Sequence, residues 1–372
     1  MEAALYDPER GFFARGRGAG RAGSDFVTSP QIGSLFGACL ARGLDGLWRA
    51  LDEPDPFLVV EAGAGNGRLA RDILRAAPGC AAALRYVLVD RATALRAEQR
   101  DLLDLEPADE ALGPFVQRTG DDHVVPAPAA GPVVAALDEL PAVEADGAVV
   151  LANELWDNLP FGVAEWDGER WHEVRVTVAE PGAFTEVLVP ATETDAADLT
   201  RDTVHAEIAS GTRLPIPRGI RAWLRECDRV LHRGFLVVID YFVTLEELRR
   251  RGESSSWLRT YRVHERGGDP LERPGAQDIT ADVITDQLRI ADFSEIYAAT
   301  QAQWLHDLGI DDLVEQGRRV WEARAHVGDI EALAGRSRAV EAAALSDCAG
   351  LGAHEVHLFG RRVGAEPGRW PG

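Results

Sequence analysis

Five short runs of apolar residues alternate with segments that have helical periodicity. The runs cover residues 57–62, 85–89, 132–137, 147–152 and 234–239, and most of them end at a carboxylate or an amide side chain. Runs that are apolar at nearly every position are typical of parallel strands buried on both faces. Their alternation with helices predicts an α/β fold, a right-handed parallel sheet with helices on both faces.

The stretch from about residue 160 to residue 230 has a different pattern. Three segments alternate apolar and polar side chains between turn dipeptides, which predicts antiparallel strands. Two segments with helical spacing follow them, so we expect an inserted α+β cap. The strands are expected at 161–166, 171–178 and 184–189, the turns at Asp167-Gly168 and Pro181-Gly182, and the helices at 195–210 and 220–231.

Helical spacing and further short apolar runs complete the pattern on either side. Helices are expected at 31–51, 67–76, 92–103, 278–288 and as three segments between 300 and 345, strands at 293–298 and 354–361, and a loop after a short helix at 244–275. We therefore predict four regions: an N-terminal segment and helix beside the ligand site (1–56), the first part of the core (57–160), the cap (161–232), and the completion of the core with additional helices (233–372).

The first apolar run leads into a glycine-rich turn. It contains Glu61, and glycines follow at Gly63, Gly65 and Gly67. A dinucleotide fingerprint needs its third glycine at position 68, which is Arg68, so the pattern argues against an NAD-dependent oxidoreductase. The order E-x-G-x-G-x-G resembles the first motif of Rossmann-like methyltransferases, whose loop passes under the amino-acid part of S-adenosylmethionine (SAM). A glycine-rich turn without any ligand is the alternative.

A second carboxylate follows the next apolar run. Asp90 lies at the expected carboxyl end of that strand, close to the separation from the glycine loop that one βαβ unit requires. An acid at this place accepts hydrogen bonds from ribose hydroxyls in such sheets. Together with the glycine loop it predicts a nucleoside-bearing cofactor.

Polar side chains after two other apolar runs are candidates for catalysis. Asn153, Glu154 and Asp157 follow the run at 147–152, and Asp240 follows the run at 234–239. A carboxylate there can orient an amine or a guanidinium and take its surplus proton. In the alternative reading Asn153 caps a turn, Asp157 is solvated and Asp240 holds a loop.

The segment before the first long helix offers a third set of polar groups. We expect Asp25, Thr28 and Ser29 to help hold the cofactor, because the N-terminus of a helix can bind a carboxylate. Simple capping of the helix is the alternative.

Composition narrows the class of partner. The net charge is −22 with a pI of about 4.8, which disfavours nonspecific nucleic-acid binding. The four cysteines and nine histidines show no metal-ligand spacing, so we expect no metal site. We find no signal peptide and no apolar run of membrane-spanning length, and we expect a cytoplasmic protein without membrane insertion.

The ordered set of motifs resembles the MidA family of SAM-dependent methyltransferases, which includes the mitochondrial complex I assembly-factor arginine methyltransferases and their bacterial relatives. Any one motif is weak, but the set extends through most of the chain. It comprises Leu5-Tyr-Asp-Pro-Glu-Arg-Gly-Phe-Phe13, Ser24 to Ile32 with Phe36-Gly37, Glu61 to Gly67, Asn153 to Pro160, Asp240-Tyr241, Leu258-Arg-Thr-Tyr261, Asp278-Ile-Thr-Ala281, and Thr300-Gln301 with Trp304-Leu305.

The resemblance implies a Rossmann-like SAM methyltransferase that methylates a nitrogen or oxygen, with a protein arginine as one acceptor. The alternatives are a small-molecule methyltransferase and a SAM-binding assembly factor without catalysis; a homodimer stays open. The chain departs from the family on the acceptor side: Ser24 replaces a glycine, Phe242 replaces a glycine, Asp282 stands where the family has histidine, and Ile284 where it has aspartate.

Overall fold

The computed structural model describes residues 1–13, 28–115, 130–180, 182–252, 256–262, 265–288, 290 and 292–371. The chain forms two compact units, each assembled from distant segments. The first unit comprises Met1–Phe26, Leu155–Arg225 and Asp240–Ala291, and the second comprises Val27–Glu154, Glu226–Ile239 and Asp292–Gly372.

A seven-stranded sheet organises the second unit, in the order β15-β16-β9-β4-β1-β2-β3. The strands from β9 to β3 are mutually parallel, and β15 and β16 pair antiparallel. The predicted parallel α/β sheet is therefore confirmed. The strands are β1 (Phe57–Ala62), β2 (Leu84–Val89), β3 (Val133–Leu137), β4 (Ala145–Asn153), β9 (Leu231–Asp240), β15 (Ser294–Thr300) and β16 (Glu355–Arg361).

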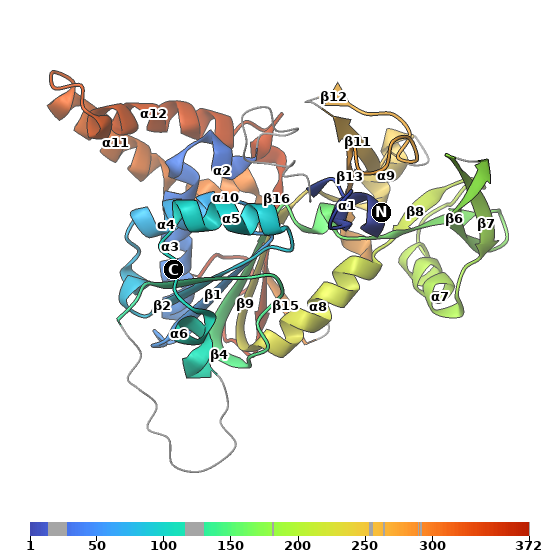
Figure 1. Cartoon of the computed structure of the whole chain (residues 1–372), viewed down its shortest axis with the longest axis horizontal. Helices are drawn as coiled ribbons and strands as arrows, with labels where there is room; N and C mark the ends of the chain where they lie inside the picture. The colour runs from blue at the N-terminus through green and yellow to red at the C-terminus, as the bar shows by residue number, and fades with distance from the viewer. Residues whose placement is uncertain are drawn as a thin grey trace, which may run out of the picture. The chain divides into compact units, whose positions relative to one another are not determined.

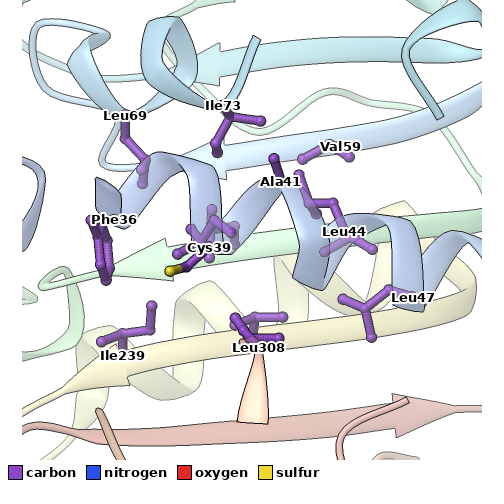
Figure 2. Packing of buried hydrophobic residues seen from close by; sticks show 14 of the residues in the cluster. Phe36, Cys39, Ala41, Leu44, Leu47, Val59, Leu69, Ile73, Ile239 and Leu308 are labelled. Atoms are coloured by element: carbon purple, nitrogen blue, oxygen red, sulfur yellow. The ribbon is translucent and has the colours of Figure 1, made fainter. Parts of the chain in front are cut away.

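Helices cover this sheet, and the long helix α3 (Ser34–Ala50) forms the centre of its core (Figure 2). Phe36 and Cys39 of α3 are fully buried, and they belong to one hydrophobic cluster with Val59 of β1 and Ile239 of β9. The other helices of this unit are α2 (Ser29–Ile32), α4 (Arg68–Arg75), α5 (Thr93–Leu102), α6 (Ala108–Leu112), α10 (Gln301–Asp307), α11 (Ile310–Arg324) and α12 (Ile330–Leu345).

The first unit contains the predicted antiparallel strands as a four-stranded sheet, β7-β6-β5-β8 (Figure 1). A second sheet of three strands, β12-β11-β13, and a short parallel pair, β10 and β14, complete it. The elements are α1 (Glu2–Tyr6), β5 (Gly162–Trp166), β6 (Trp171–Glu180), β7 (Ala183–Pro190), α7 (Glu193–Asp202), β8 (Arg213–Ile216), β10 (Phe242–Val243), α9 (Leu245–Arg251), β11 (Leu258–Arg262), β12 (Glu265–Arg266), β13 (Asp278–Ala281) and β14 (Val283–Ile284); α8 (Arg218–Val230) begins in this unit.

Three expectations about elements were wrong. Residues 278–288 form β13, β14 and a 3₁₀ turn instead of a helix, because β-branched Ile279, Thr280 and Val283 favour strands that pair with β11 and β10. The helix expected at 195–210 ends at Asp202. The region expected as a loop at 244–275 also contains β11 and β12. No described helix is long and apolar enough to cross a membrane.

Candidate active site

Three strand ends meet at one edge of the parallel sheet in the second unit. Ala62 of β1 is in register with Val89 of β2 and with Ala152 of β4. The residues that follow these three positions are Gly63, Asp90 and Asn153, so they lie at the same level of that edge. Ligands of parallel α/β sheets bind outside the carboxyl ends of the strands, which makes this edge the candidate site.

The glycine loop is held from two sides. The backbone N–H of Gly65 donates to Asp90 Oδ2 at 2.9 Å, and Gln99 Nε2 donates to the Gly65 carbonyl at 2.7 Å. Gly65 has φ +55°, and a Cβ added there would meet nothing within 4 Å. Open space above a rigidly held backbone turn suits a ligand that lies against bare peptide groups.

The third glycine has a packing role instead. Gly67 has φ +81° and precedes α4 as its N-cap. A Cβ added there would lie 3.1 Å from Leu88 and 3.2 Å from Gln99. Gly65 therefore leaves open space for a ligand, whereas Gly67 lets the loop pack closely against Leu88 and Gln99.

Asp90 is oriented by backbone donors on both oxygens. Its Oδ1 accepts from the Ala92 N–H at 2.8 Å, while Oδ2 accepts from Gly65. Burial raises the pKa of Asp90 to about 6, although the two backbone hydrogen bonds act to lower it. The carboxylate is thus fixed in position next to the glycine loop and is ionised at neutral pH.

Glu61 has a hydrogen-bond partner, Tyr86, that the sequence did not predict. Its Oε2 accepts a hydrogen bond from the hydroxyl of Tyr86 at 2.7 Å, and its side chain is buried. Burial raises the pKa of Glu61 to about 8, and the tyrosine hydrogen bond only partly offsets this. Gln99 was also missed. Its signal in the sequence is a polar side chain four residues after Leu95, on the buried face of its helix.

Asn153 and Glu154 follow β4 in a special backbone conformation. Glu154 has φ +51°, and its N–H donates to the Ile239 carbonyl at 2.8 Å. Asn153 Nδ2 lies 3.5 Å from Glu154 Oε1, and Asn153 Oδ1 is buried without a hydrogen-bond partner among the described residues. A left-handed conformation at a non-glycine residue costs about 1–3 kcal/mol and often accompanies function.

Asp157 and Asp240 lie in the first unit. Asp240 is fully buried and accepts backbone N–H donors from Trp156 at 2.8 Å, Asp157 at 3.4 Å and Tyr241 at 2.8 Å. Burial raises its pKa to about 6 against these hydrogen bonds. Its carboxylate therefore holds the turn that begins the 3₁₀ segment Trp156–Asn158, and Asp157 is buried in that turn.

Segments far apart in the sequence converge on the same turn. The hydroxyl of Tyr6 donates to the Asn158 carbonyl at 3.0 Å, and Asn158 Nδ2 donates to Asp278 Oδ1 at 3.2 Å. The N-terminal motif, the motif after β4 and the motif at 278–281 thus meet in the first unit. They are 152 and 120 residues apart in the chain.

A charged cluster lies beside this turn in the first unit. Asp282 forms ion pairs with Arg251 and Arg259, each at 2.5 Å. Arg259 also stacks over the ring of Tyr241, with 5.4 Å between its guanidinium carbon and the ring centroid. Burial acts to lower the pKa of Arg259. The negative charges of Asp282 and, more weakly, Asp157 act to raise it by a larger amount, so the pKa is raised overall.

The polar groups before α3 are engaged within the protein. Ser29 Oγ donates to Gln301 Oε1 at 2.9 Å, and Thr28 is the N-cap of the short α2. The predicted long helix starts only at Ser34, and its Leu35 N–H donates to the Glu341 carboxylate at 2.9 Å. Glu341 therefore occupies the N-terminus of α3, whereas Thr28 and Ser29 lie at the start of α2, where contact with the cofactor stays a prediction. Asp25 lies outside the described residues.

The residues present fit SAM. Gly65 leaves open space, Asp90 presents an ionised carboxylate at the neighbouring strand end, and Asn153 Oδ1 is an orphaned acceptor at the same sheet edge. These features define a class, a Rossmann-like SAM methyltransferase.

Comparisons with known proteins support the same class, a SAM-dependent methyltransferase. A family model described as "Putative S-adenosyl-L-methionine-dependent methyltransferase" matches residues 39–303. A crystal structure from Burkholderia thailandensis with bound S-adenosyl-homocysteine has a TM-score of 0.76 and 28% identity, covering 98% of this chain and 87% of that one. The chain belongs to this family of SAM-dependent methyltransferases.

Curated relatives are mitochondrial. The protein arginine methyltransferase NDUFAF7 homolog of Drosophila melanogaster is 27% identical over 305 residues, and the human protein arginine methyltransferase NDUFAF7 is 28% identical over 332 residues. The alignments cover 76% and 84% of this chain. They span 63% of the length of the Drosophila relative and 69% of the human one.

Proposed function

We propose that this protein transfers the methyl group of SAM to a guanidinium nitrogen of an arginine in a protein. The observation that carries the proposal is the position of Glu154. It follows β4 directly after Asn153, which lies level with Gly63 and Asp90 at the candidate SAM site. A carboxylate beside the methyl donor is the group that arginine methylation needs.

The chemistry assigns a task to each side chain. SAM supplies an electrophilic methyl group on a sulfonium. Asp90 accepts hydrogen bonds from the cofactor hydroxyls, and the open face of Gly65 receives the cofactor. The Glu154 carboxylate orients the guanidinium through its N–H donors and draws electron density toward the attacking nitrogen. Asn153 holds that carboxylate in place.

The reaction balances without a further reagent. The bond between sulfur and the methyl carbon breaks as the bond between nitrogen and that carbon forms. The sulfur leaves as a neutral thioether, and the acceptor nitrogen loses one proton to Glu154 and then to water. The product is a methylguanidinium that keeps a single positive charge. Holding the two reacting groups at attack distance supplies most of the rate enhancement.

The first unit shows how carboxylates hold a guanidinium within this protein. A guanidinium of the protein itself, that of Arg259, already lies in the field of Asp282 and Asp157. Asp157 is buried in the turn at 4% exposure, and we assign it to positioning that turn. Asp240 has its carboxylate directed at backbone N–H groups, and we assign it to positioning the turn.

A second candidate is methylation of a small molecule, and the first unit has a small apolar hollow. Its lining includes Trp156, Phe161, Ile220 and Ile284, with Asp282 and Gln287 as polar groups. Small-molecule sites usually enclose roughly 300–1,000 Å³, whereas this hollow has room for on the order of one water molecule, so it does not hold an acceptor as it stands. The arginine acceptor is preferred because the Glu154 carboxylate follows β4 at the sheet edge that carries Gly63 and Asp90.

The decisive experiment uses SAM with a labelled methyl group. The protein is incubated with dialysed lysate of its source organism, the proteins are precipitated and hydrolysed, and the labelled amino acids are separated. We expect label in methylarginine, and none when the Gly65→Val variant replaces the wild type. Label confined to other amino acids, to base-labile esters or to the small-molecule fraction would overturn the arginine assignment.

A further inference from the structure

Arg68 is a cationic residue directly after the glycine loop, where it begins α4. Its Nε atom is buried, and it has no hydrogen-bond partner in the part of the chain that the structure describes. The carboxylate of Asp72, one turn further along α4, already forms an ion pair with Arg71 at 2.7 Å. A buried donor of a charged group is costly to leave unsatisfied, so a ligand acceptor beside Arg68 would stabilise it.

The start of a helix determines where its first side chain lies. Cα–Cβ bonds of an α-helix tilt toward its N-terminus, so the side chain of the first residue leans over the segment that precedes the helix. For Arg68 that segment is the glycine loop. The backbone N–H of Arg68 also donates to Oδ1 of Asn66 in that loop at 3.3 Å. The position of this guanidinium is therefore coupled to the position of the loop.

α2 brings a second buried donor to the same helix of the second unit. α2 packs against both α3 and α4. Gln31 of α2 accepts a hydrogen bond at Oε1 from the backbone N–H of Thr28 at 3.1 Å, which assigns the other end of its amide as the nitrogen. This Nε2 atom is buried, and no described residue accepts a hydrogen bond from it. Two helices in contact thus each carry one buried donor that can serve an anion.

The chemistry of SAM indicates which of its groups fits these donors. Its carboxylate is its single anionic group and belongs to the amino-acid part, whereas the sulfonium and the ammonium are positive and the adenine and ribose are neutral. A guanidinium beside the glycine loop would repel the two cationic groups, and it complements the carboxylate best. We propose that Arg68, assisted by Gln31, binds the carboxylate of SAM. The proposal rests on the SAM site and is independent of the acceptor.

Isothermal titration of the full chain with SAM and with decarboxylated SAM tests this contact, because the second ligand lacks the carboxylate and keeps the sulfonium, ammonium and nucleoside. We expect the wild type to bind decarboxylated SAM roughly 10-fold to 100-fold more weakly than SAM. Arg68→Gln should lose a similar factor for SAM and stay within about threefold of the wild type for decarboxylated SAM. The four affinities form a cycle that isolates the carboxylate contact from any general effect on the site.

Gln31→Glu is a second variant, and it carries the test if Arg68→Gln does not fold. It keeps an oxygen that can accept from the Thr28 N–H, as a glutamate at this helix position commonly does, but replaces the donor by a second oxygen. We therefore expect it to weaken SAM binding more than the binding of decarboxylated SAM. Arg75→Gln, which removes the same charge from the exposed last turn of α4, is the matched control and should leave both affinities unchanged.

Two results would overturn the carboxylate assignment. One is a wild type that binds SAM and decarboxylated SAM equally well. The other is an equal loss of affinity for both ligands in Arg68→Gln, which would show a purely structural role. A wild type that binds neither ligand would contradict the SAM site itself, so the two kinds of failure can be told apart.

Discussion

The carboxylate of Asp90 accepts a hydrogen bond from the backbone N–H of Gly65 at 2.9 Å. This bond joins two parts of the SAM site that are 25 residues apart in the chain, the glycine loop after β1 and the acid after β2. The acid therefore fixes the loop as well as offering an oxygen to the ligand. Because its pKa is raised to about 6, both tasks weaken as the pH falls through that value.

Replacing Asp90 should weaken SAM binding and change its pH dependence. Protonation below the pKa of about 6 removes an acceptor, so wild-type affinity should be lower at pH 5 than at pH 7.5. Asp90→Asn should bind SAM roughly 10-fold to 100-fold more weakly at pH 7.5, which corresponds to the loss of one charge-assisted hydrogen bond. Its affinity should also change less between the two pH values. Isothermal titration measures both, and Asp101→Asn on the exposed side of α5 is the control.

Glu61 should make stability depend on pH in a predictable direction. Burial raises its pKa to about 8 from an ordinary value of 4.5, so the folded protein holds this proton in a window where the unfolded chain has lost it. The free energy of unfolding should therefore fall, through this group, as the pH rises from 4.5 through 8.

Glu61→Gln cannot titrate and should keep the hydrogen bond from Tyr86. The difference in free energy of unfolding between the variant and the wild type should therefore shift in favour of the variant by roughly 1–3 kcal/mol when the pH is raised from 5 to 9. Urea unfolding at both pH values measures this difference. A difference that stays constant with pH would show that Glu61 is not protonated in the folded protein.

Glu154→Gln should separate catalysis from cofactor binding. The amide keeps the size of the side chain but cannot accept the proton of the acceptor nitrogen, so we expect turnover to fall roughly 100-fold or more. SAM affinity should stay within about threefold, since the loss of this charge leaves the contacts of Asp90 and Gly65 intact. Glu144→Gln, in which the exposed partner of His232 is changed, is the matched control. Normal turnover in Glu154→Gln would remove the catalytic assignment.

Asp240→Asn should act through the turn that Asp240 holds. The amide nitrogen would replace one of the two carboxylate oxygens, so a donor would face either the Trp156 N–H, which now donates to Oδ2, or the Tyr241 N–H, which now donates to Oδ1. We expect a loss of about 1–3 kcal/mol in the free energy of unfolding, measured in urea. Unchanged stability combined with lost turnover would instead indicate that the Asp240 carboxylate contacts the acceptor.

The sequence predicted the elements whose burial is uniform. β1, β2, β4 and β9 are apolar at most positions because most of their side chains are buried, and such runs can be recognised without knowledge of their partners. The segment 278–288 was mistaken for a helix, because short strands are stabilised by pairing with β11 and β10, which lie elsewhere in the chain.

The polar contacts of the site also depend on residues that lie far apart in the chain. The motifs predicted which residues gather at the strand ends, including Glu61, Asp90 and Asn153. They did not predict that Tyr86 would donate to Glu61 or that Gln99 would hold Gly65, because these contacts join residues 25 and 34 positions apart. Nor did they show that Asp240 points at backbone donors, which is a matter of side-chain direction rather than of spacing.

The most direct test of the account is isothermal titration of SAM into the wild type, Gly65→Val and Gly252→Val. Gly65 and Gly252 both have positive φ and open space around an added Cβ, so the two variants carry a similar backbone strain of about 1–2 kcal/mol. Only the first places a side chain over the SAM loop. We predict that the wild type and Gly252→Val bind SAM with one site while Gly65→Val shows no binding heat. Equal SAM affinity in Gly65→Val, or a wild type that binds NAD and not SAM, would contradict the account.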